Sequence, residues 1–71
     1  MRFSELLKGK EFWSDKFSDR LVRFIKIGDL PTDKNTYLPG SGTKITHRGN
    51  AERGDGLLFF FSPEEEVAPL V

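Results

Sequence analysis

An unbroken run of five apolar residues, Leu-Leu-Phe-Phe-Phe at positions 57–61, constrains the fold more than any other feature of this sequence. Successive side chains of an extended strand point to opposite faces, so this run places large apolar groups on both faces. Such a strand needs cover on both sides and is predicted to lie in the centre of a sheet. Asp55-Gly56 before the run is typical of a hairpin turn, and Ser62-Pro63 after it ends the strand, because proline has no amide hydrogen to donate.

The chain has 71 residues, which predicts one small domain over residues 1–71. A chain of this length cannot divide its apolar side chains between two cores. It contains no cysteine, which excludes a disulfide, a thiolate metal site and a thiol nucleophile. Seven Phe, one Trp and one Tyr carry much of the apolar area, so we expect an aromatic core that no disulfide stabilises.

The charges of the chain balance, with 11 basic and 11 acidic side chains. A neutral chain has no overall field that attracts it to a polyanion, so any nucleic-acid binding would be local. The longest apolar run, five residues, is far short of the roughly 20 that cross a bilayer. Charged side chains near the N-terminus interrupt anything that resembles the apolar core of a signal peptide. We expect a cytoplasmic protein with no membrane partner.

The N-terminal segment predicts a short helical turn. Phe3 and Leu6 lie at helical spacing, and Gly9 follows as a residue that readily ends a helical turn. Residues 10–14 contain two adjacent aromatic side chains and favour a short strand, because aromatic residues suit a pleated, half-buried surface.

Residues 21–27 admit two interpretations. Their β-branched side chains favour a strand, and the Gly28-Asp29 pair that follows favours a turn. The alternative is a helix around residues 16–27, which would make the fold α+β. Its amphipathic stripe, at spacing i, i+4, i+7 and i+8, consists of Phe17, Leu21, Phe24 and Ile25. We favour the strand on residue type and on length.

The remaining segments complete a β-rich pattern. Residues 30–35 have the composition of a loop, and short strands are predicted at 36–38 and 43–47, with a final edge strand or tail at 65–70. Short strands joined by Gly and Pro turns predict a mostly β fold, a small antiparallel, SH3-like curled sheet or barrel with a short N-terminal helical turn. The predicted core consists of Phe12, Phe24, Ile45, Leu58, Phe59 and Phe60.

Two short motifs mark the ends of the chain. The first, F-x-x-L-x-x-G-x-x-F, runs from Phe3 to Phe12, and the second, F-S-P-E-x-E-V, runs from Phe61 to Val67. In these motifs the chain resembles a group of short uncharacterised bacterial and phage proteins that commonly open with the first pattern and close with F-S-P-D/E-x-E-V. The match covers about a third of the chain and omits residues 31–56. The resemblance implies a compact β-rich domain, SH3-like in form, without an assigned activity.

Aromatic side chains carry the main functional prediction. If Phe12 points into the core, the adjacent Trp13 points out of it. An outward Trp13 with Phe17 or Tyr37 would form an aromatic anchor for a protein partner, because Trp, Tyr and Arg dominate the energies of interfaces. We therefore predict a non-enzymatic interaction protein that presents a surface to a protein partner, with a homodimer as one form of that interaction.

The alternative function is weak nucleic-acid binding through the hairpin at 44–53. This segment is the one local concentration of basic groups, which are Lys44, Arg48 and Arg53 together with the titratable His47. On the rim of a barrel they could hold a nucleic-acid strand by phosphate contact, with base stacking on a nearby aromatic ring. Three cations would bind weakly and in a salt-sensitive way, and a solvated hairpin with ordinary surface charges is the simpler interpretation.

The single histidine is the one candidate for general-base chemistry. His47 has Asp55 nearby in sequence and could act as a base for Ser41 or Thr43. An exposed histidine at the end of a strand explains the pattern more simply. We predict that the chain is not an enzyme, with no catalytic residues.

Three further patterns are interpreted as turns. The carboxylates of residues 64–66 point in alternate directions on an extended chain, which favours a solvated acidic turn over a divalent-cation site. The glycine-rich segment 40–44 lacks the spacing of a phosphate-binding loop. The Arg-Gly-Asp tripeptide at 53–55 is interpreted as a tight polar hairpin. We therefore predict no metal and no cofactor.

Overall fold

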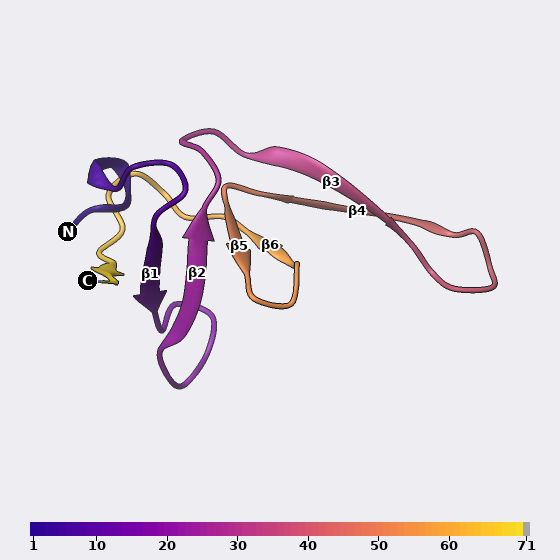
Figure 1. Cartoon of the computed structure of the whole chain (residues 1–71), viewed down its shortest axis with the longest axis horizontal. Coiled ribbons are helices and arrows are strands. Elements are labelled where there is room, and N and C mark those ends of the chain that lie inside the picture. The colour runs from indigo at the N-terminus through magenta and orange to yellow at the C-terminus, as the bar shows by residue number, and fades with distance from the viewer. Residues whose placement is uncertain (71) are drawn as a thin grey trace.

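The computed structural model describes residues 1–70 and confirms a mostly β, antiparallel fold that begins with a short helical turn. The strands form a five-stranded sheet, in the order β6-β5-β2-β1-β7, and a separate two-stranded sheet, β3-β4 (Figure 1). The elements in chain order are the 3-10 turn η1 (Phe3–Glu5), β1 (Glu11–Ser14), β2 (Val22–Lys26), β3 (Thr32–Tyr37), β4 (Lys44–Gly49), β5 (Ala51–Arg53), β6 (Leu58–Phe59) and β7 (Ala68–Pro69).

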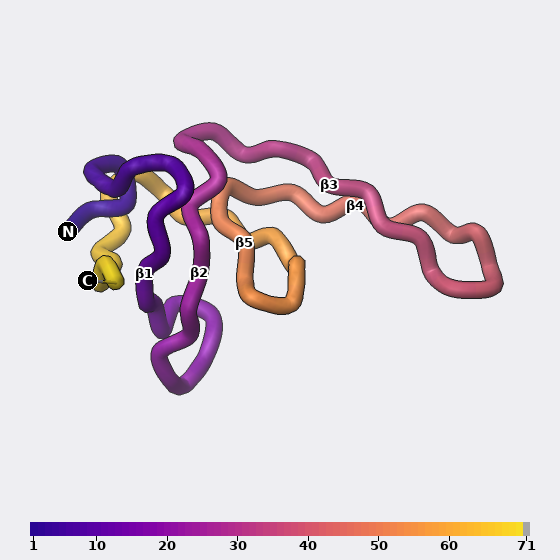
Figure 2. The backbone as a smooth tube through the Cα atoms, in the orientation of Figure 1, coloured from indigo at the N-terminus to yellow at the C-terminus, as the bar shows by residue number. Residues whose placement is uncertain are grey.

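The molecule has two regions, which we call the body and the arm. The body consists of residues 1–31 and 50–70 and contains the five-stranded sheet and the N-terminal turn. The arm consists of residues 32–49, which are β3, β4 and the turn between them. Figure 2 shows the arm running away from the body, and the molecule is accordingly elongated, at 42 × 25 × 18 Å.

The two sheets do not close into a barrel. Closure would require the two edges of the five-stranded sheet to pair with each other. Those edges are β6 and β7, each of only two residues, and β7 contains Pro69, which has no amide hydrogen. The barrel form of the prediction is therefore wrong, because the longest strands of the chain leave the sheet to form the arm.

The core of the body is aromatic, as the composition predicts. Four phenylalanine side chains are at most 2% exposed, and their ring centroids lie 5.1 to 5.7 Å apart in stacked and edge-to-face pairs. Aromatic pairs of this kind each contribute about 0.5–1.5 kcal/mol beyond the burial of their area. The four residues come from the N-terminal turn, two central strands and the C-terminal segment, and are Phe3, Phe12, Phe24 and Phe61.

The alternation of side chains along β1 is as predicted. Phe12 pairs with Phe24 of β2, and both side chains are buried on the inner face of the sheet. The neighbouring pair, Trp13 with Arg23, lies on the opposite face, where Trp13 is 36% exposed. One face of the five-stranded sheet thus packs on the core, while the other carries an exposed tryptophan.

The helix considered around residues 16–27 is wrong, because residues 22–26 form a strand. β2 pairs with β1 on one side and with β5 on the other, so both of its neighbours satisfy its backbone groups. The proposed helical stripe is split between environments: Phe24 is buried, whereas Leu21 is exposed and Ile25 lies on the outer face of the sheet. The β-branched residues therefore indicated the conformation better than the i, i+4 spacing did.

The prediction of a central strand at 57–61 is wrong. Only Leu58 and Phe59 form a strand, β6, which lies at the edge of the sheet. The side-chain amide of Asn50 takes the place of a further strand at Phe61, where Oδ1 accepts from the amide nitrogen at 2.9 Å and Nδ2 donates to the carbonyl at 2.8 Å. Phe61 consequently turns into the core, and Phe60 stays exposed.

Two members of the predicted core are also wrong. Ile45 is 36% exposed because it lies on the arm, away from the body. Phe60 is 48% exposed because the neighbouring Phe61 turns into the core. The predicted loop at 30–35 is in part a strand, because β3 begins at Thr32 and pairs with β4 over six residues. Cross-strand pairing outweighs the low strand propensity of its Asp, Lys and Asn side chains.

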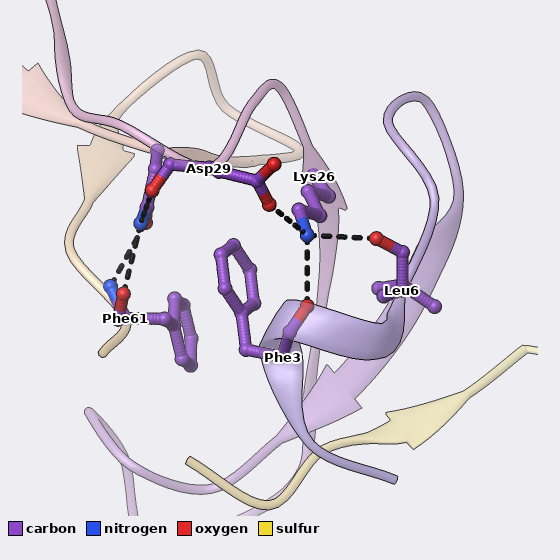
Figure 3. A network of polar contacts seen from close by, with 6 residues as sticks. Phe3, Leu6, Lys26, Asp29 and Phe61 are labelled. Carbon is purple, nitrogen blue, oxygen red and sulfur yellow. Dashed lines mark hydrogen bonds and ion pairs between the residues drawn. The ribbon is translucent and has the colours of Figure 1, made fainter. Parts of the chain in front are cut away.

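A buried lysine joins the N-terminal turn to the sheet. Lys26 is 2% exposed, and its ammonium donates to the carbonyls of Phe3 at 2.8 Å and Leu6 at 2.7 Å (Figure 3). The same nitrogen lies 2.7 Å from a carboxylate oxygen of Asp29 and 4.5 Å from the centre of the Phe3 ring. All three ammonium hydrogens therefore have acceptors, and the group serves the structure of the body.

Candidate protein-interaction surface

The outer face of the arm is exposed along its whole length. Three cross-strand pairs share this face, and all six side chains are exposed. Two of the pairs are hydrogen-bonded through their side chains. Arg48 donates to Asp33 at 3.2 Å, and Thr46 donates to Asn35 at 3.0 Å. From the base to the tip, the pairs are Asp33 with Arg48, Asn35 with Thr46 and Tyr37 with Lys44.

Among residues 1–70, the contacts of the opposite face with the body lie at the base of the arm. Lys34 donates to the carbonyl of Gly56 at 3.2 Å and lies 3.9 Å from Glu52. Gly49 lies so close to Phe59 that a β-carbon there would come within 2.6 Å of its backbone nitrogen. Beyond this base, the arm projects away from the body (Figure 1).

The tip of the arm combines apolar side chains with a glycine turn. Tyr37 is 66% exposed and Leu38 is 47% exposed. Gly40 and Gly42 have φ values of +79° and +70°, which residues with a β-carbon rarely adopt. The predicted turn at 40–44 thus closes the hairpin, and Tyr37 and Leu38 lie exposed just before it.

The arm depends on few interactions for its stability. A two-stranded hairpin is at best marginally stable in water, and three strands or a packed face are usually needed. The body supplies such packing only at the base of the arm, through Lys34 and Gly49. A further strand or an apolar surface from another molecule would therefore supply packing that the arm lacks.

The three predicted anchor residues do not form one patch. Trp13 lies on the outer face of the five-stranded sheet. Phe17 is 44% exposed, but its ring packs on the edge of the core, 4.7 Å from the ring of Phe59 and 5.4 Å from that of Phe61. Tyr37 lies on the arm, so the structure separates it from the two aromatic residues of the body.

The basic residues of the nucleic-acid prediction are also divided. Lys44 and Arg48 lie on the outer face of the arm, whereas His47 lies on its opposite face. Arg48 pairs with Asp33, and Arg53 in the body pairs with Asp55. The structure does not bring these four groups together on one surface.

The histidine does not meet the hydroxyl groups considered for it. His47 Nε2 lies 3.3 Å from Thr36 Oγ1, on the facing strand of the arm. Ser41 and Thr43 are instead bonded to each other at the tip, where the amide of Thr43 donates to Ser41 Oγ at 3.2 Å.

The Arg-Gly-Asp segment forms the polar turn of the β5–β6 hairpin. The Arg53 guanidinium donates to both carboxylate oxygens of Asp55, and the amide of Leu57 donates to the same carboxylate at 3.2 Å. The hydrogen bond from Arg53 lowers the pKa of the Asp55 carboxyl to about 2, and the same contact raises the pKa of Arg53. The following Gly56 has a φ of +89°, so the predicted Asp-Gly hairpin turn is confirmed.

The sequence did not predict the first part of β3, residues 32–35. Its residues include Asp33, Lys34 and Asn35, which are poor strand formers, so composition indicated a loop. A usable signal was present, however, because a Pro-Gly-Ser-Gly turn lies between Thr36-Tyr37 and the alternating segment 44–48. Extending that hairpin toward its base would have predicted β3.

The outer face of the body also contains a shallow hollow. It has a volume of about 410 Å³ and is lined by Gly9, Lys10, Glu11, Ile25 and Leu70. Over residues 1–70, no three His, Asp or Glu side chains are placed to hold a metal ion. Within the same residues, no helix has the length and apolar character to cross a membrane.

No protein-family model matches this chain, and comparison with curated proteins and with solved structures found no significant match. The resemblance to short bacterial and phage proteins, and the SH3-like form that it implies, therefore stay predictions.

Proposed function

We propose that this chain is a non-enzymatic interaction protein and that the arm is the surface it presents to a protein partner. The observation that carries the proposal is that the arm projects from the body as a two-stranded hairpin with Tyr37 and Leu38 exposed at its tip (Figure 1). Apolar and aromatic side chains on a projecting hairpin are available to fill a pocket of another protein, and aromatic anchors dominate the energies of interfaces.

The shape of the arm supports this role. Its two six-residue strands hold Tyr37 at a distance from the body, and Arg48 pairs with Asp33 across its outer face. Glycines at the tip let the apolar side chains lie on a narrow turn. A partner that covers the tip would remove apolar area from water, at about 25 cal/mol for each Å².

Site-specific photo-cross-linking in the cells that make this protein tests the proposal. A photoreactive phenylalanine analogue is placed at Tyr37 in one variant and at Leu21 in the other. Leu21 is the matched control, because it is apolar, 58% exposed and located in the body. We expect a discrete protein adduct from position 37, lost when Leu38→Lys is added, and none from position 21. Equal labelling at both positions, or none at position 37, would contradict the proposal.

The nucleic-acid alternative is tested with the purified protein. Because Lys44, His47, Arg48 and Arg53 are divided between surfaces, we expect no saturable binding of a labelled oligonucleotide at low salt, where phosphate contacts are strongest. Saturable binding that Lys44→Glu weakens and added salt abolishes would favour nucleic acid as the partner.

A further inference from the structure

The backbone of β3 has an open edge. In an antiparallel pair, residues that exchange hydrogen bonds alternate with residues whose amide and carbonyl groups point away from the partner strand. The amide of Leu38 donates to the carbonyl of Thr43 at 3.0 Å, which marks this opposed pair as hydrogen-bonded. Alternation along the register then points the backbone groups of Asp33, Asn35 and Tyr37 outward. We call these three residues the open edge of β3.

The other strand edges of the molecule are less available. The five-stranded sheet ends in strands of two residues, one of which contains Pro69, and short or proline-containing edges resist further pairing. The outward edge of β4 is covered just past its end at the base of the arm, where the amide of Asn50 donates to the carbonyl of Phe59 at 3.0 Å. Within residues 1–70, no comparable bond reaches the open edge of β3.

We propose that the open edge of β3 pairs, antiparallel and about a two-fold axis, with the same edge of a second copy of this chain. The product is a continuous four-stranded sheet with the order β4–β3–β3–β4. The inference rests on the proposed function, because it names a second copy as the protein partner of the arm. Four strands also meet the requirement that the isolated hairpin fails, namely three or more strands in one sheet.

Charge and the position of Pro39 favour one register for this pairing. With Asn35 opposite the Asn35 of the second copy, Asp33 faces Tyr37 and Lys34 faces Thr36, so no like charges are opposed. Moving the axis to Lys34 would oppose two ammonium groups. Moving it to Thr36 would bring Asp33 opposite Pro39, which has no amide hydrogen.

The same test disfavours pairing through β4. With Thr46 opposite itself, Lys44 would face Arg48 of the second copy on both sides of the axis, which opposes cations twice. Pairing of β3 with the β4 edge of another copy would not close and would build filaments. The closed dimer through β3 is therefore the assembly that the charges and the free edge favour.

Sedimentation of the purified protein over a concentration series up to about 1 mM tests the dimer. We expect a reversible monomer–dimer equilibrium. Asn35→Lys should weaken it at least about tenfold, because it places like charges opposite each other at the axis. Thr46→Lys is the matched control: it lies opposite Asn35 within the chain, loses the same side-chain hydrogen bond and adds the same charge, but lies on β4. It should dimerise as the unmodified chain does.

A charge-swap experiment makes the two-fold axis falsifiable even if single variants are less stable. Asn35→Lys and Asn35→Asp should each dimerise more weakly alone than the unmodified chain, while an equimolar mixture should form the mixed dimer, because opposite charges then meet at the axis. A mixture that stays monomeric, an equal loss in Thr46→Lys, or growth beyond the dimer would overturn the inference. An unmodified chain that stays monomeric up to about 1 mM would also overturn it.

The dimer and the proposed function can fail separately. A monomeric purified protein, combined with a cross-link from Tyr37 to a different protein, would end the dimer while leaving the arm as an interaction surface. A dimer that Asn35→Lys leaves intact would place self-association elsewhere and overturn the inference.

Discussion

The body and the arm are built from strands of similar type but stabilise them in different ways. In the body, β5, β2 and β1 each have two neighbouring strands, and Phe12 of β1 and Phe24 of β2 belong to one core with Phe3 and Phe61. In the arm, two longer strands have only each other, and Tyr37, Leu38 and Ile45 are exposed. Strand length therefore does not measure stability in this molecule, because burial and the number of neighbouring strands decide it.

The contrast extends to polar groups. Lys26 and Asn50 in the body are buried, and their side-chain nitrogens and oxygens all have partners in the described part of the chain. The outer face of the arm holds its polar groups in exposed pairs, such as Arg48 with Asp33, which contribute little when water screens them. The buried polar groups of the body are thus satisfied by the body itself, whereas the polar groups of the arm remain in contact with water.

The largest expected effect comes from removing a core ring. Phe61→Ala should lower the free energy of unfolding by about 3–5 kcal/mol, because the side chain is fully buried among four other rings. Tyr37→Ala, the counterpart in the arm, should change it by about 0.5 kcal/mol or less in the monomer. Urea denaturation at low protein concentration measures both variants. Equal losses of unfolding free energy would show that Tyr37 is packed as firmly in the arm as Phe61 is in the body.

The joint between the regions should give the next largest effect. Gly49→Ala would place a β-carbon against the backbone of Phe59, so the arm or β6 must move, at a cost of about 3 kcal/mol. Gly54→Ala is the matched control, since nothing lies within 4 Å of the added carbon. Thermal unfolding compares the two variants; similar melting temperatures would show that the joint is looser than described.

The buried lysine should follow in size. Lys26→Met keeps the volume of the side chain but leaves the carbonyls of Phe3 and Leu6 without their donor, which should cost about 2 kcal/mol. Lys34→Met in the arm removes a half-exposed contact to Gly56 and should cost about 0.5 kcal/mol. Chemical denaturation measures the free energy of unfolding of both variants. A larger loss in Lys34→Met would show that the contacts of the arm stabilise the fold more than the buried lysine of the body does.

The smallest expected effect is a pH dependence at the β5–β6 turn. The pKa of Asp55 falls from its ordinary 3.8 to about 2 in the folded protein, mainly through the hydrogen bond from Arg53. A lowered folded-state pKa stabilises the fold above 3.8, and this contribution is lost as the pH falls through about 2. Asp55→Asn should therefore lower the melting temperature slightly at about pH 6 and leave it unchanged near pH 2. An equal difference at both pH values would assign the effect to something other than this titration.

Local patterns predicted those parts of the fold that local forces decide. The alternation of Phe12 and Trp13, the Asp-Gly turn before β6 and the short edge strand near Pro69 follow from side-chain period and turn chemistry. The central placement of residues 57–61 failed because the competing partner, the amide of Asn50, comes from another strand. A single sequence does not show which distant polar group will replace a strand.

The candidate surface likewise combines features that local sequence predicts with features that depend on distant contacts. Tyr37 was predicted as an anchor from its residue type alone, and it is exposed on the arm, but its separation from Trp13 follows from the placement of the arm. The open edge of β3 was not predicted, because Asp33 and Asn35 have low strand propensity and acquire their conformation from β4.

Local sequence was enough to predict an aromatic, disulfide-free core, an antiparallel β fold and the positions of its glycine turns, because side-chain period, residue size and backbone freedom act over a few neighbouring residues. Which strands lie at an edge, the burial of a lysine beneath the N-terminal turn and the departure of residues 32–49 as an arm were evident in the folded molecule alone. These features depend on contacts between distant parts of the chain, where hydrogen bonding and packing compete and local preference yields to the better partner.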